Sequence, residues 1–265
     1  MTFTIVGERI NTTLKNVQEA VAVRDAAYIE ADVREQEAAG ATYIDVNAGA
    51  RIGHEKEDMQ WLLKIIQDAV TVPLCLDSPD PAVLEMAYGM VAKTPMVNSI
   101  SLEKERYDAM IPFLKGKACK IIALCMDDTG MPTSADDVVV RAKKIVQALE
   151  DIGIKRDDIY VDPLIQPMSV DIQNGQMALE AVKRIMTEIS GVHTIGGLSN
   201  ISYGLPQRRI INRNFLALMM AAGMDAAIMD PLDHELVALL QTTEMLLGRD
   251  EYCMNFIAAV REGRI

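Results

Sequence analysis

The sequence has few basic residues for its length. Its 26 Lys and Arg residues face 38 Asp and Glu residues, so the formal net charge is -12 at pH 7. No stretch supplies a block of Lys and Arg, and binding to a phosphate backbone requires a basic field. The composition therefore weighs against a nucleic-acid partner. With 50% apolar and 24% charged residues, the chain can still bury a core, which excludes a disordered protein.

Long apolar runs are also missing. The longest, such as Phe215 to Met224, reach about half of the roughly 20 residues that are needed to cross a bilayer. The first residues lack both the basic start and the apolar stretch of a secretory signal. We therefore expect a cytoplasmic protein with no membrane partner.

Patterns that bind metal ions or form disulfides are absent. The cysteines and histidines form neither a C-x-x-C pair nor an H-E-x-x-H motif, and most of the cysteines lie in apolar segments. These residues are Cys75, Cys119, Cys125 and Cys253, and His54, His193 and His234. We expect buried, reduced thiols and no metal site.

Short β-branched runs alternate with stretches of helical period along the whole chain. The expected strands are Thr4–Gly7, Tyr43–Asn47, Leu74–Asp77, Met96–Ser99, Ile121–Met126, Ile159–Asp162, Thr194–Leu198 and Ala226–Met229. The expected helices are 16–39, 57–70, 80–92, 103–115, 135–152, 174–189, 210–222 and 233–247, with a short terminal helix around 250–262. This alternation predicts an α/β fold.

The organisation of these units favours one domain over residues 1–265. A length of 265 residues suits either two small domains or one large barrel. An open doubly wound sheet can also be built from such units, but no Pro/Gly/Ser-rich linker divides the chain. Eight uninterrupted units therefore predict a single closed (β/α)₈ TIM barrel with a short C-terminal helix.

Polar residues stand at the ends of several expected strands. In a parallel barrel all strands deliver their last residues to the same rim. One such residue alone could simply cap the next helix. Together, however, four of them on different strands favour a ligand site: Asp77, Asn98, Asp162 and Asn200.

The chemistry of these four side chains predicts a ligand rich in N–H donors. A carboxylate accepts two hydrogen bonds side by side, and an amide both donates and accepts. The fused pyrimidine edge of a pterin presents an amino group, ring N–H groups and a carbonyl that match this set. No phosphate-binding G-x-x-x-x-G-K-[ST] loop or strand-linked G-x-G-x-x-G occurs, which disfavours nucleotide chemistry.

Several sequence blocks resemble a known family. They are Gly7-Glu8-Arg9-Ile10-Asn11, Leu76-Asp77-Ser78, Val97-Asn98-Ser99, Asp162-Pro163-Leu164, Gly197-Leu198-Ser199-Asn200-Ile201-Ser202, Arg208 and Ile211-Asn212-Arg213. In this order they resemble the pterin-binding methyltransferases that move a methyl group between tetrahydrofolate and a corrinoid protein. The resemblance covers essentially the whole chain.

The resemblance implies a homodimeric barrel with methyltetrahydrofolate lying across the carboxyl ends of the strands. It places Asp77, Asn98 and Asp162 at the pterin edge and Asn200, the catalytic candidate, beside N5. Arg208 is implied as a further folate contact. Gly197 and Ser199 belong to the same binding set, and four residues are additional candidates for it: Asn11, Asp45, Asn47 and Tyr203.

Three further predictions follow from particular residues. Glu8 and Arg9 are adjacent on the first strand and are expected to form an ion pair at the barrel mouth. Asp77 and Asp162 are expected to be ionised, because ring N–H donors favour a carboxylate. The apolar helix around 214–222 is expected to be buried, with an exposed part that could form the dimer face.

The function that this resemblance implies is methyl transfer from methylcobalamin, carried by a partner protein, to N5 of tetrahydrofolate in a methyl-donor demethylation pathway. No D-x-H-x-x-G cobalamin signature occurs in this chain, so the corrinoid must come from a separate protein. The opposite transfer, from methyltetrahydrofolate to a corrinoid iron-sulfur protein in acetyl-CoA synthesis, stays open. The same pterin pocket would also serve a non-catalytic folate-binding module or a dihydropteroate synthase, although the phosphate loop of the synthases is missing.

Overall fold

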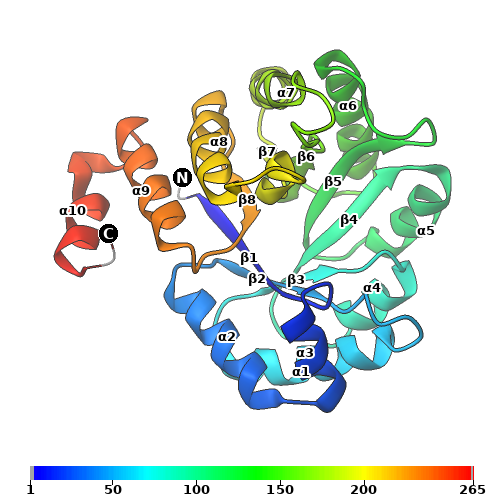
Figure 1. Ribbon diagram of the computed structural model, residues 1–265. Coiled ribbons are helices and arrows are strands. Elements are labelled where there is room, and N and C mark those ends of the chain that lie inside the picture. The colour runs from blue at the N-terminus through cyan, green and yellow to red at the C-terminus, as the bar shows by residue number, and fades with distance from the viewer. Residues whose placement is uncertain (1–2, 264) are drawn as a thin grey trace.

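A computed structural model describes residues 3–263 and 265 as a parallel sheet surrounded by helices (Figure 1). The strands are β1 (Thr4–Asn11), β2 (Tyr43–Asn47), β3 (Leu74–Asp77), β4 (Met96–Leu102), β5 (Lys120–Asp127), β6 (Ile159–Asp162), β7 (His193–Thr194) and β8 (Ala226–Met229). Their order is β7-β6-β5-β4-β3-β2-β1-β8. All neighbours are parallel, as the predicted (β/α)₈ barrel requires.

The helices follow the strands in the predicted alternation. They are α1 (Lys15–Val23), α2 (Ala26–Ala38), α3 (Glu55–Ala69), α4 (Pro81–Tyr88), α5 (Lys104–Leu114), α6 (Ala135–Asp151), α7 (Asn174–Glu188), α8 (Arg208–Ala222), α9 (His234–Leu246) and α10 (Met254–Arg261), with the 3₁₀ helices η1 (Arg156–Asp158), η2 (Leu198–Ser202) and η3 (Glu251–Cys253). The short C-terminal helix α10 was predicted, and it lies beside α9 on the outside of the ring (Figure 1).

Two expected elements differ from the structure in more than their end points. The expected helix 16–39 is two helices, because Arg24 takes a left-handed conformation (φ 58) after α1 and the Asp25 side chain caps α2 through the Tyr28 N–H. The expected strand Thr194–Leu198 is wrong beyond Thr194. Only β7 forms a ladder there, and Leu198 begins η2 instead.

The barrel therefore closes through a narrow seam between β7 and β8. A single isolated bridge joins Gly197 to Ile228, supported by a hydrogen bond of 3.0 Å from the Ile228 N–H to the Gly196 carbonyl. Every other neighbouring pair of strands is joined by a ladder of at least two residue pairs. The predicted (β/α)₈ barrel is thus confirmed, and it is nearly closed, with an isolated bridge at the β7–β8 seam.

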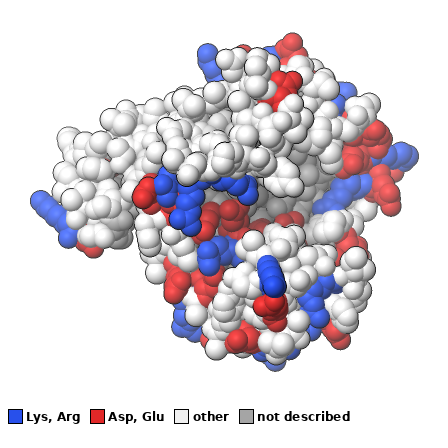
Figure 2. All heavy atoms as spheres, viewed as in Figure 1, with Lys and Arg blue, Asp and Glu red and all other residues white. Residues whose placement is uncertain are grey.

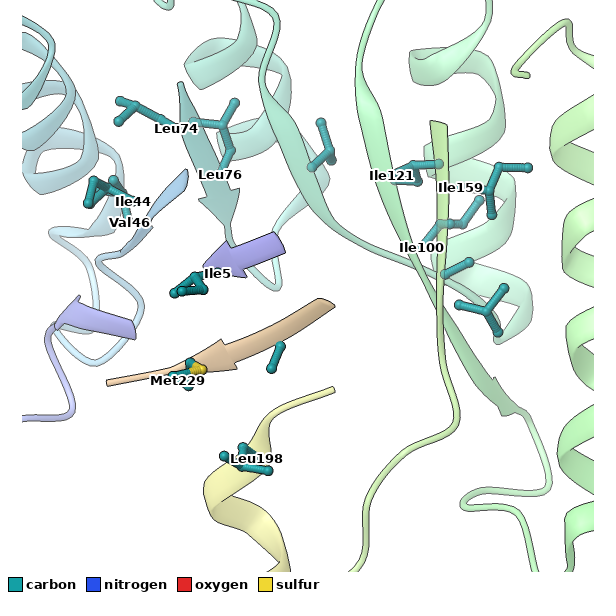
Figure 3. Close-up of a cluster of buried hydrophobic side chains, with 14 of the residues drawn as sticks. Ile5, Ile44, Val46, Leu74, Leu76, Ile100, Ile121, Ile159, Leu198 and Met229 are labelled. Carbon is teal, nitrogen blue, oxygen red and sulfur yellow. The ribbon is translucent and has the colours of Figure 1, made fainter. Parts of the chain in front are cut away.

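Apolar side chains fill two separate spaces. Outward-pointing strand residues, such as Ile44, Val46 and Leu74 in Figure 3, pack against the helices in the larger core. A smaller cluster fills the inside of the barrel, from Val6, Cys75, Met96, Ile122, Tyr160, Ile195 and Ala226. This alternation follows from the two-residue period of a strand.

Three of the four cysteines are buried, as expected, whereas Cys253 is exposed; all four are free thiols. Among the described residues, no helix combines the length and the hydropathy that crossing a membrane requires.

Candidate functional site

A ring of polar side chains continues the barrel interior toward the carboxyl ends of the strands. Each member follows a residue of the inner cluster by two positions, so both side chains point to the same side. The pairs are Val6 and Glu8, Cys75 and Asp77, Met96 and Asn98, and Tyr160 and Asp162. The structure thus brings together the candidates Asp77, Asn98 and Asp162, and adds Glu8 to them.

Strand β1 is longer than expected and contains a bulge. Its pairing steps from Gly7–Ile44 to Ile10–Val46, so β1 has one residue more than β2 over this stretch. A bulge of this kind changes the direction of the following side chains. As a result Asn11, a candidate contact, lies opposite Asn47 at the barrel mouth.

The expected ion pair between Glu8 and Arg9 is wrong. The guanidinium of Arg9 pairs with Asp32 of α2 at 2.8 Å and with Asp230 at 3.3 Å. Asp32 is buried outside the barrel wall, whereas Glu8 follows the inward-pointing Val6. Adjacent strand residues face opposite sides, and this separates the two charges.

The pairing of β2, β3 and β4 places three candidates next to one another. Asn47 pairs in register with Asp77, and Asp77 with Asn98. The Asn47 side-chain amide donates a hydrogen bond of 2.7 Å to Asp77, while its carbonyl accepts one from the Gly49 N–H. Asp77 is therefore held in one orientation before any ligand contacts it.

Arg106 of α5 supports this part of the mouth from behind. It donates hydrogen bonds to the carbonyls of Ser78 at 3.0 Å and Ser99 at 2.6 Å, which directly follow Asp77 and Asn98. Burial raises the pKa of Asp77, and the positive charge of Arg106 opposes this rise. Nothing in the sequence marks Arg106 as part of the site beyond its position early in a helix, and it was not among the expected residues.

Burial shifts the titration of the acidic groups. It raises the pKa of Asp162 to about 7, and the hydrogen bond from the Leu164 N–H opposes this shift. Burial also raises the pKa of Asp77, against the hydrogen bond from Asn47. The expected ionised carboxylates are thus not secured by the protein alone, and N–H donors of a ligand would be needed to stabilise them.

Asp45 lies deeper in the barrel than the other candidates. It is 2% exposed, and its Oδ1 atom has no hydrogen-bond partner among the described residues. Burial, followed by the charges of Asp77 and Glu8, raises its pKa well above the usual range. Burial therefore disfavours the charged form of Asp45 beneath the mouth.

The opposite side of the mouth carries the remaining candidates. Gly197 precedes η2, which contains Ser199 and the exposed Asn200. Arg208, the first residue of α8, donates a hydrogen bond of 2.7 Å to the Ser199 carbonyl and one of 3.0 Å to the Ser202 hydroxyl. These bonds tie Arg208 to the segment that presents Asn200.

Gly197 provides the space for the Asn200 amide. A Cβ atom at Gly197 would lie 3.1 Å from the Asn200 Nδ2 atom, closer than a normal contact.

Tyr203 lies at the edge of the site, 66% exposed, after η2. Figure 2 shows basic and acidic side chains gathered around a hollow in this face of the molecule.

The apolar helix α8 is mainly a core element. Its residues Phe215, Leu216, Met219 and Met220 are buried, and Leu218 remains 54% exposed. Burial therefore explains most of this apolar segment, as expected.

Comparisons with known proteins give matches over most of the chain. The profile of the family described as "Pterin binding enzyme" matches residues 7–230. The chain is 35% identical to a methylcorrinoid:tetrahydrofolate methyltransferase of Eubacterium limosum, over 98% of this chain and 97% of that protein. It is 25% identical to the methionine synthase of Mycobacterium tuberculosis over 84% of this chain, which corresponds to 20% of the synthase.

Solved structures share the fold at low sequence identity. A dihydropteroate synthase of Coxiella burnetii, determined with pteroic acid, superposes with a TM-score of 0.69 at 13% identity and covers 92% of this chain and 94% of that one. The dihydropteroate synthase of Xanthomonas albilineans gives 0.68 at 15% identity, with 94% and 92% coverage. At this identity the likeness concerns the fold alone.

Proposed function

The chain belongs to the pterin-binding enzyme family, and on this premise we propose that it transfers a methyl group from a methylcorrinoid protein to N5 of tetrahydrofolate. The observation that carries the proposal is the full-length similarity, at 35% identity, to a methyltransferase with this reaction in its name. The mouth of the barrel, with its carboxylate and amide groups, supports the same ligand class.

Three groups would hold the pterin. Asp77 and Asp162 accept hydrogen bonds from its amino and ring N–H groups, and Asn98 can both donate and accept. They lie on β3, β6 and β4, so they contact the ligand from different sides of the mouth. The aspartates then act as positioning groups, and neither transfers a proton.

Asn200 is proposed as the residue beside N5. Its exposed side chain can form a hydrogen bond with N5 and follow the change in charge as the methyl group is transferred. We expect this interaction to contribute about 2 to 4 kcal/mol, as one preorganised hydrogen bond does in other enzymes. Arg208 keeps the segment of Asn200 in place through the Ser199 carbonyl.

The methyl donor is a corrinoid carried by a partner protein. The partner must dock over the carboxyl ends of the strands, because the methyl group has to reach N5 there. We further propose that the protein is a homodimer and acts in the cytoplasm. Sedimentation velocity of the pure protein tests the first of these two properties.

An anoxic spectroscopic assay tests the activity. The protein is mixed with tetrahydrofolate and methylcob(III)alamin, and the cob(I)alamin absorption band should appear. A spectrum that stays unchanged at high protein concentration contradicts the proposal. Running the assay from methyltetrahydrofolate and cob(I)alamin measures the opposite direction.

A variant distinguishes the enzyme from a folate-binding module without catalysis. Asn200→Ala should lose turnover while keeping most of its affinity for tetrahydrofolate. The matched control is Asn255→Ala in α10, where the exposed side chain lies far along the chain from the mouth. Equal rates with and without the wild-type protein would instead support the binding module.

A further inference from the structure

The proposed function does not yet use Glu8, a carboxyl group of the barrel mouth. Glu8 extends from the bulged part of β1, two residues after the inward-pointing Val6. No described residue forms a hydrogen bond with its carboxyl group. The Glu8 carboxyl group therefore has no hydrogen-bond partner in the structure, whereas Arg9 pairs with Asp32.

The sheet register places Glu8 near the segment of Asn200. Ile228 of β8 pairs with Val6 on one side and bridges to Gly197 on the other. Two strand spacings thus separate Val6 from Gly197, a distance of about 10 Å. Glu8 extends from the same wall of the barrel toward its mouth, where Asn200 follows Gly197 by three residues.

The charged groups around Glu8 support this position. Burial and the charge of Asp230 raise the pKa of Glu8 to about 7. Arg208, whose guanidinium contacts the carbonyl next to Asn200, is close enough to oppose this rise, and Arg9 acts in the same direction. Asp45 of β2 is the remaining acidic neighbour.

The other carboxyl groups of the mouth are less suited to exchange a proton at N5. Asp77 and Asp162 are assigned to the pterin edge, and Asp45 is buried beneath it. Asp230 already accepts hydrogen bonds from Arg9 and from the Leu232 N–H. Among the described carboxyl groups of the mouth, Glu8 is the one that combines access to the mouth, the absence of a hydrogen-bond partner and proximity to the Asn200 segment.

We propose that Glu8 is a catalytic residue that accepts the proton of N5 during methyl transfer to tetrahydrofolate. The inference rests on the proposed function. The lone pair of N5 forms the new bond to the methyl carbon, and the cobalt–carbon bond breaks with both electrons left on the partner's cobalt. As this bond forms, N5 releases its proton to the Glu8 carboxylate. In the opposite direction, protonated Glu8 returns that proton to N5 as the carbon–nitrogen bond breaks.

The pH dependence of the two directions tests this role. Transfer to tetrahydrofolate needs ionised Glu8, so its rate should rise as the pH increases through about 7. Transfer from methyltetrahydrofolate needs protonated Glu8, so its rate should fall over the same range. Glu8→Gln should lose both dependences and slow transfer at pH 8 by about 100-fold, while tetrahydrofolate still binds.

Two other variants keep the test decisive. Glu8→Asp retains a titrating carboxyl group and should keep a pH-dependent rate, which a purely structural role would not require. Asp230→Asn removes the charge that raises the pKa of Glu8, so the wild-type profile should move to lower pH. Glu19→Gln, on α1 with a side chain 67% exposed, is the matched control and should behave as the wild type.

The outcomes separate this inference from the function on which it rests. A wild-type protein that transfers no methyl group in either direction overturns the proposed function. If the wild type is active and Glu8→Gln keeps both its rate and its pH profile, only the role of Glu8 is overturned. A Glu8→Gln protein that does not fold leaves the decision to the profiles of Glu8→Asp and Asp230→Asn.

Discussion

Asp77 depends on a neighbouring amide for its orientation and charge. The Asn47 side chain donates its hydrogen bond at 2.7 Å and lowers the pKa of Asp77 against the effect of burial. In Asn47→Ala the pKa of Asp77 should rise and its carboxylate should lose a fixed position. We expect tetrahydrofolate to bind about 3- to 30-fold more weakly, which corresponds to one lost hydrogen bond. Isothermal titration calorimetry measures this change.

The control for this prediction is Asn255→Ala, which changes the same residue type outside the barrel mouth. Equal affinities of Asn47→Ala and the wild type would show that the Asn47 amide does not prepare Asp77 for the ligand.

Asp162 is predicted to serve binding at the expense of stability. Its pKa is raised from 3.8 to about 7 by burial, so the folded state holds a proton that the unfolded state has lost. Stability therefore falls as the pH rises from about 4 to 7, and the loss is complete above that range. Asp162→Asn should be more stable at pH 8 by about 1 to 4 kcal/mol, yet bind tetrahydrofolate more weakly.

Urea unfolding at a series of pH values measures this effect. The stability difference between Asp162→Asn and the wild type should shrink toward pH 4, where both side chains are neutral. A difference that is the same at pH 4 and pH 8 would contradict the assigned cause. Titration calorimetry of both proteins checks the opposite change in affinity.

At the scale of elements, strand β1 packs closely against helix α2 at Gly7. A Cβ atom at this position would lie 2.2 Å from the side-chain oxygen of Gln36, which is fully buried in α2. The Gln36 amide in turn donates to Asp32 at 2.7 Å, and Asp32 holds Arg9. The side chain of Gln36 therefore cannot move without disturbing the network that anchors the bulged strand.

Gly7→Ala should consequently reduce the free energy of unfolding by about 1 to 3 kcal/mol, the usual cost of overpacking. Chemical denaturation of the variant measures this loss. Removing the obstructing side chain in Gly7→Ala/Gln36→Ala should make the two changes non-additive, with a smaller total loss than the sum of the single variants. Strict additivity would mean that the predicted clash is absent.

At the scale of the whole molecule, barrel closure depends on a polar cluster at the amino end of the seam between β7 and β8. Asp225 accepts a hydrogen bond of 3.0 Å from the Thr194 N–H and contacts the His193 ring at 2.6 Å. His193 also stacks on Tyr160 of β6 and lies 3.4 Å from Asp157. This cluster reinforces the seam that is otherwise closed by a single bridge.

The cluster predicts a pH-dependent stability. Asp225 raises the pKa of His193 above its usual value of 6.5, with a smaller effect from Asp157 and opposition from burial. A raised folded-state pKa stabilises the protein fully below pH 6.5 and loses its effect as the pH rises through the raised value. His193→Gln should therefore lower the free energy of unfolding more at pH 5.5 than at pH 9.

Equilibrium unfolding of the two proteins at both pH values measures the difference. His234→Gln is the matched control, because His234 is an exposed histidine at the start of α9. A stability loss for His193→Gln that does not depend on pH would contradict the ion pair with Asp225.

The sequence by itself determined the order of the elements and the chemistry of the strand ends. Every expected strand has a counterpart, because β-branched runs and helical periods are local properties that each segment carries independently. The polar residues Asp77 and Asp162 close their strands in the structure as expected, whereas β4 continues past Asn98 to Leu102. A parallel barrel brings such ends together whatever the loops between them contain.

Only the tertiary structure decided which of these groups face one another. The partner of Arg9 is 23 residues away in α2, and the bulge that directs Glu8 and Asn11 arises from pairing with β2. Arg106 and the raised pKa values of Glu8 and Asp162 likewise depend on burial by distant segments. Side-chain direction, pairing and desolvation are set by contacts between segments remote in the chain, and local sequence patterns do not specify them.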